Sequence, residues 1–82
     1  MASLQFLIDN MCAGFTVASM YALVRTRLAE GACTIGDIAH RVAEADRTLD
    51  IGSAKTLAEA AIEALAKSGD VVVQEAYIHA AG

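Results

Sequence analysis

The chain has 82 residues and two cysteines without ligand-like spacing, so we expect one domain with two buried, reduced thiols, Cys12 and Cys33, in a cytoplasmic protein. Its net charge of −4, with six Lys and Arg against ten Asp and Glu, argues against a general nucleic-acid binder, because duplex binding depends on neutralising phosphates. The apolar fraction of 56% is high for so small a protein, and we expect a homodimer to bury the excess apolar surface.

The first third of the chain is apolar enough to raise the question of a membrane span. A spanning helix needs about 20 apolar residues, and Asp9 with Asn10 would lie inside any such window here. A signal peptide begins with a basic segment, whereas no Lys or Arg precedes Arg25. We therefore expect neither a membrane span nor a signal peptide.

The same segment predicts a helix that is broken near Gly14. Thr16 can cap a second helical segment, because its hydroxyl accepts a backbone amide of the first turn, and apolar residues recur at helical spacing on both sides of the break. Residues 1–82 then form a single domain, in which 1–15 is an N-terminal helical extension and 16–79 is a helix-turn-helix core with a C-terminal strand.

Small residues recur at every fourth position in this region, at Gly14, Ala18 and Ala22. On a helix they would lie on one line and let another helix approach closely. Two interpretations are open: a helix of the same chain covers this line, or the line is the seam of a homodimer.

The middle of the chain, residues 32–52, predicts a short capped helix and a turn. Thr34 and Asp37 have the spacing of a capping box, and apolar residues follow at helical spacing up to Ala45. Asp37, His40 and Glu44 are three and four residues apart, which permits a metal site on one helix face. No second His or Cys completes such a set, so we favour a solvated helix flank and expect no metal or other cofactor.

Residues 53–68 predict the best-formed helix of the chain. Its apolar face lies opposite a charged outer face, and Gly69 stands where a left-handed helix end belongs. Val71, Val72 and Val73 then predict a strand that continues to His79. The residues of the outer face are Lys55, Glu59, Glu63 and Lys67.

This order of elements resembles a winged helix-turn-helix domain. A helix, a capped short helix, a turn and a longer helix lead into Ala-Leu-Ala-Lys-Ser-Gly-Asp-Val-Val-Val at 64–73. In that superfamily the third helix ends in a turn with Leu and Gly before the first strand of the wing. The resemblance covers Thr16 to Ile78 and is similar in style to small regulators of the MarR or ArsR kind, without their ligand or metal signatures. It implies a mainly α domain of three to four helices with a small β element.

Two departures from the family pattern bear on function. The helix that would read bases presents Glu59 and Glu63, which repel phosphates, and leaves Lys55 and Thr56 as its usable residues. A wing needs a hairpin turn with Gly, Asn or Asp, but only Gln74-Glu75-Ala76 separates Val73 from Tyr77. We therefore expect a short or degenerate wing, or one long exposed strand whose edge can pair with another chain.

Three functions remain, the last of which is a purely structural dimerisation domain. The favoured hypothesis is a non-enzymatic interaction protein, a homodimer that modulates or inhibits a larger protein, in the style of small acidic phage products that act on host machinery. Its partner would bind the outer face of helix 53–68 and the strand, at Lys55, Glu59, Glu63, Lys67, Val72 and Gln74. The alternative is a DNA-binding transcriptional regulator that uses Arg41, Arg47, Lys55 and Thr56, with Arg25 and Arg27 on the same surface.

Overall fold

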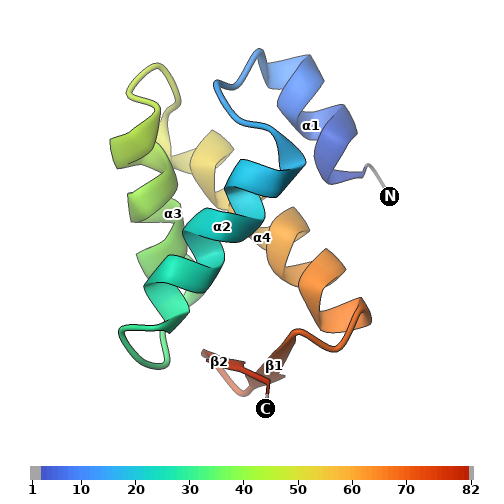
Figure 1. The fold of residues 1–82 in the computed structure, drawn as a ribbon. Coiled ribbons are helices and arrows are strands. Elements are labelled where there is room, and N and C mark those ends of the chain that lie inside the picture. Colours follow the sequence, from blue (N-terminus) through green and yellow to red (C-terminus); the bar gives the residue numbers. More distant parts are fainter. Residues whose placement is uncertain (1–2, 82) are drawn as a thin grey trace.

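The computed structural model describes residues 3–81, which form four helices and one β-hairpin (Figure 1). This mainly helical domain with a small hairpin wing confirms the predicted fold class. The helices are α1 (Leu4–Met11), α2 (Val17–Leu28), α3 (Ile35–Ala45) and α4 (Ile51–Lys67), and the strands are β1 (Val71–Gln74) and β2 (Tyr77–Ala80).

The break between α1 and α2 lies where the sequence predicts it. Helix α1 ends at Cys12, whose backbone is left-handed with φ of 53°. Helix α2 begins after Thr16, which accepts the Ser19 amide and completes a capping box with the Ser19 hydroxyl. Because α1 packs against α4 and adds Leu4 and Ile8 to the core, it is a structural part of the domain. The first two residues of the predicted extension lie outside the described residues.

Local hydrogen bonds also define the ends of α3 and α4. Thr34 and Asp37 form the predicted capping box at the start of α3. Helix α4 begins earlier than residue 53, because the Asp50 carboxylate accepts the Ser53 amide at 2.7 Å and so caps the helix. At its other end Gly69 has the predicted left-handed conformation, with φ of 83°, and the Asp70 amide bonds back to the Leu65 carbonyl.

Helix α4 lies at the centre of the fold and packs against α1, α2, α3 and β1. Its buried face combines large and very small side chains, which lets neighbouring helices approach closely. The buried residues of α4 are Ala54, Leu57, Ala58, Ala61, Ile62 and Leu65. The five from Leu57 onward recur at the helical spacing that predicts a buried face, and Ala54 extends this face by one turn.

The wing is a hairpin and not the single long strand that the missing turn residues suggested. Strands β1 and β2 are antiparallel, with Val71 opposite Ala80 and Gln74 opposite Tyr77. Glu75 makes the two-residue turn feasible by adopting a left-handed backbone, with φ of 57°. On the far side of β2, Cys33 forms an antiparallel bridge with Ile78.

Candidate protein-docking surface

The outer face of α4, defined as Lys55, Glu59, Glu63 and Lys67, is exposed along the whole helix. The core-facing stripe of α4 is fully apolar, so its charged residues all lie on the opposite side. Residues four apart on this face, Lys55 with Glu59 and Glu63 with Lys67, have the spacing of helix ion pairs. Glu63 Oε1 and Lys67 Nζ are 3.4 Å apart and form such a pair. Within residues 3–81, Lys55 and Glu59 do not form one.

A groove of about 470 Å³ joins α4 to the hairpin and to the start of α3. Ile35, Ile62 and Val73 give it an apolar floor and wall, while Lys55 and Glu75 are its charged residues. Val73 is 49% exposed and Ile51, at the start of α4, is 52% exposed. The fold thus places Lys55, the first residue of the outer face of α4, at the same groove as the exposed Val73 of the hairpin.

Val72 and Gln74, the predicted strand residues of the site, lie on the outer side of β1 together and are both exposed. Their cross-strand partners are His79 and Tyr77, and Tyr77 is 53% exposed. The sequence analysis did not include Tyr77, although its place in alternation with the buried Ile78 would have indicated an outward side chain. The hairpin therefore adds an aromatic residue to the candidate surface.

The cations required for DNA binding do not gather on this surface. Arg41 pairs with Glu30 at 2.6 Å, and this hydrogen bond holds the pKa of the Glu30 carboxyl below its ordinary value. Arg27 lies 3.7 Å from Asp37 and donates to the Gly31 carbonyl.

Two further cations lie elsewhere. Arg47 lines a depression with His40 and Glu44 at the end of α3. The guanidinium of Arg25 lies over the Tyr21 ring, 6.0 Å from its centre. Of the residues named for the DNA alternative, Lys55 and Thr56 are adjacent and exposed at the start of α4, whereas Arg41 and Arg47 lie on other parts of the surface.

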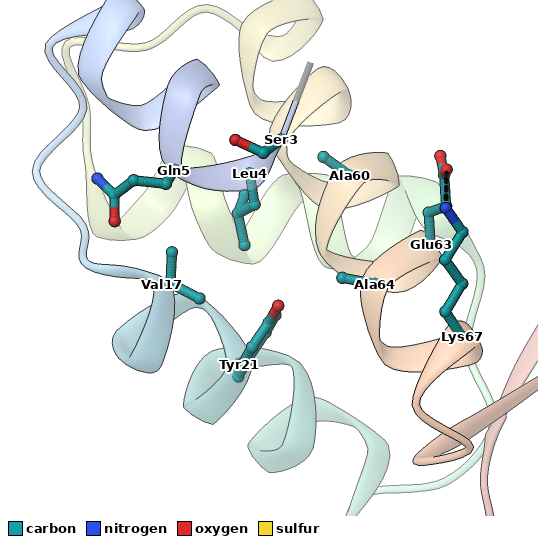
Figure 2. A pocket seen from close by; sticks show the side chains of 9 residues that line it. All are labelled: Ser3, Leu4, Gln5, Val17, Tyr21, Ala60, Glu63, Ala64 and Lys67. Atoms are coloured by element: carbon teal, nitrogen blue, oxygen red, sulfur yellow. Dashed lines mark ion pairs between the residues drawn. The ribbon is translucent and has the colours of Figure 1, made fainter. Parts of the chain in front are cut away.

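A second groove, of about 420 Å³, lies between α1, α2 and α4 (Figure 2). Leu4, Val17 and Tyr21 face it from α1 and α2, opposite Ala60 and Ala64 of α4. The Glu63–Lys67 ion pair stands at its rim (Figure 2). Sequence reasoning missed this groove, although small residues four apart on α4 show where side-chain volume is lacking.

The predicted dimer seam is only partly helical. Gly14 lies in the loop before α2, where its amide donates to Asp46 Oδ2 at 2.9 Å. Ala18 and Ala22 are exposed on α2, so no other helix in residues 3–81 covers them, and the intrachain interpretation is wrong. A dimer contact through Ala18 and Ala22 stays a prediction.

Two further sequence predictions concern a metal site around Asp37 and the two cysteines. The Asp37 carboxylate is engaged by Thr34, whose amide lowers the pKa of that carboxyl. In the described part of the chain, no three His, Cys, Asp or Glu side chains come together as a metal site. Both cysteines are free, but Cys12 is exposed where a buried thiol was predicted; Cys33 is buried, which raises the pKa of its thiol.

Compared with protein families, with curated proteins and with solved structures, the chain has no match. None of the helices within residues 3–81 is long and apolar enough to cross a membrane.

Proposed function

We propose that this protein is a non-enzymatic interaction module, a homodimer that binds a larger protein and modulates or inhibits it. The observation that carries the proposal is the outer face of α4, where Glu59 and Glu63 lie between Lys55 and Lys67 and where Lys55 borders an apolar groove. A charged rim around exposed apolar side chains is typical of surfaces that bind proteins.

The apolar part of this surface is large for so small a domain. Ile51, Val72, Val73 and Tyr77 are each about half exposed, at 46 to 53%. Ile51 lies at the start of α4, Val72 and Tyr77 lie on the outer face of the hairpin, and Val73 lines the groove. The partner would insert apolar side chains there and meet the carboxylates of α4 with basic groups.

DNA binding is the second candidate, and the topology favours it. Helices α3 and α4 are joined by a short turn and followed by a hairpin, and Cys33 bridges to Ile78 as a third strand would. In helix-turn-helix proteins the second helix of such a pair enters the major groove. Against it, Arg27, Arg41 and Lys67 are engaged in ion pairs and so are less available to phosphates.

Affinity capture from the source cell tests the proposal. We expect a protein to be retained by the unmodified chain and by Glu44→Arg, and to be lost with Glu59→Arg. The two variants change the charge equally, but Glu44 lies on α3, away from the outer face of α4. If the Glu59→Arg variant retains the same protein as the unmodified chain, the partner site is not on the outer face of α4.

Binding to a labelled duplex separates the two candidates. If the protein reads DNA, it binds at low salt, binding falls steeply as salt increases, and Lys55→Ala weakens it. The interaction module gives no shift with any duplex at low salt. A shift that depends on Lys55 would overturn the proposal in favour of the regulator.

A further inference from the structure

Helix α1 is held to the rest of the domain by apolar contacts alone. Leu4 and Ile8 are its buried residues, and among the described residues no hydrogen bond or ion pair joins Leu4–Met11 to another helix or strand. By contrast, α2 and α3 are also linked by the ion pair of Arg27 with Asp37. Helix α1 can therefore leave the core without breaking a polar contact to a neighbouring element.

The packing of α1 against α2 and α4 is incomplete. Leu4 points into the groove of about 420 Å³, where it faces Ala60 and Ala64 of α4 (Figure 2). These short side chains leave space between the helices, so α1 gains less contact energy there than a closely packed helix. Its eight residues are also too few for a stable helix in water, since isolated helices need about 12–15 residues. The helix therefore depends on the burial of Leu4 and Ile8.

The loop after α1 shows where a movement of α1 would end. The Gly14 amide donates to Asp46 Oδ2 at 2.9 Å, which ties the loop to the end of α3. Thr16 then caps α2 by accepting the Ser19 amide. Both contacts can persist when α1 leaves, because neither involves Leu4–Met11. The separable unit is thus α1 with the few residues that precede Gly14.

We infer that α1 is a lid: it opens as a unit while the other helices and the hairpin stay folded, and its opening controls access to the apolar face of α4 that it covers. Helix α1 lies at one edge of the helical cluster, and the loop at residues 12–16 joins it to α2 (Figure 1). In the open state Leu4 and Ile8 are in water, and the groove merges with the uncovered face of α4. This device goes beyond the proposed function, which uses residues that are exposed while the lid is closed.

Amide hydrogen exchange of the unmodified chain tests whether α1 opens by itself. The amides from Ile8 to Met11 should have protection factors at least about tenfold lower than the Leu65 amide of α4, because they exchange without unfolding of the whole domain. Equal protection of the α1 amides and Leu65 would overturn the inference.

A mild core substitution outside α1 separates local opening from global unfolding. Ile38→Val removes one methylene group from the fully buried Ile38 of α3, a change that folded proteins tolerate. It should lower the protection factor of the Leu65 amide severalfold and leave those of the α1 amides unchanged, because the state with α1 open retains the contacts of residue 38. If the protection factors of α1 and Leu65 fall by the same factor, α1 opens only with the whole domain and the inference is wrong.

Two alanine substitutions within α1 distinguish a lid from a helix end that frays. Ile8→Ala removes a buried contact and should lower the protection factor of the Met11 amide at least about tenfold. Phe6→Ala is the matched control, because Phe6 is 57% exposed, and it should not lower this protection. Alanine favours a helix more than Ile or Phe does, so simple fraying would decrease in both variants. Equal effects of the two substitutions would contradict the inference.

Discussion

Glu75 and Cys12 both have left-handed backbones, with φ of 57° and 53°. This conformation costs a residue with a Cβ roughly 1–2 kcal/mol, and glycine is the residue that adopts it without a steric penalty. The left-handed backbone of Glu75 closes the turn between β1 and β2, and that of Cys12 ends α1. Neither residue type signals such a backbone, so the sequence pattern predicted neither the turn nor the exposed position of Cys12.

Replacing Glu75 by glycine should stabilise the fold. The relief of strain exceeds the roughly 0.5–1 kcal/mol that glycine loses in chain entropy, so we expect the free energy of unfolding to increase by roughly 0.5–1 kcal/mol. Urea unfolding followed by circular dichroism measures this difference. Glu75→Ala is the control, because it removes the carboxylate and retains the Cβ. Equal stabilities of the Gly and Ala variants would show that the turn is not strained.

At the scale of helices and strands, the features that the sequence predicted best are those that depend on residues close together in the chain. The caps at Thr16 and Thr34 and the end at Gly69 depend on bonds across a few residues, and all three are confirmed. The bond from the Gly14 amide to Asp46 joins residues 32 apart, and no local pattern contains it. For the same reason Gly14 lies outside α2, and of the predicted line of small residues only Ala18 and Ala22 are on the helix.

The carboxylates that hold these element ends predict a loss of stability in acid. The Thr34 amide lowers the pKa of Asp37, bonds from Thr48 and Gly14 lower that of Asp46, and the Ser53 amide lowers that of Asp50. Each folded pKa lies below the ordinary value of 3.8, so the stabilisation is complete above that pH. It is lost as the pH falls through the folded pKa values.

Thermal unfolding between pH 7 and pH 2 measures this dependence. The midpoint should fall below about pH 4, and Asp46→Asn should make that fall shallower because it removes one carboxylate whose bonds join two loops. Glu59→Gln, which removes an exposed carboxylate outside the caps, is the control. An Asp46→Asn profile parallel to that of the unmodified chain would mean that Asp46 contributes no stability through its charge.

At the scale of the whole molecule, charge and shape point to different partners. The sequence predicted the outer face of α4 because helical spacing alone determines which residues lie opposite the apolar stripe. It could not place Lys55 of that face at the same groove as Val73, because this depends on how the hairpin folds back. The order of α3, α4 and the hairpin is compatible with a helix-turn-helix-like topology, while the carboxylates on α4 would repel the phosphates of DNA.

Reversing these charges tests whether charge alone separates this surface from DNA. Glu59→Lys with Glu63→Lys raises the net charge from −4 by two units for each substitution, to 0. If α4 is as accessible to a duplex as a DNA-recognition helix, the double variant should gain salt-sensitive binding to duplex DNA that the unmodified chain lacks. Fluorescence anisotropy with a labelled duplex at several salt concentrations measures it.

A variant with the same net charge provides the control for this experiment. Asp9→Lys with Glu44→Lys also raises the net charge to 0 but places the new cations on α1 and α3. Because these cations are not aligned along one exposed helix, we expect weaker binding than with the α4 variant. Equal binding by both variants would show that net charge matters and that α4 is not presented to a duplex. Binding specific to the α4 variant would mean that Glu59 and Glu63 are what keep this surface from binding DNA.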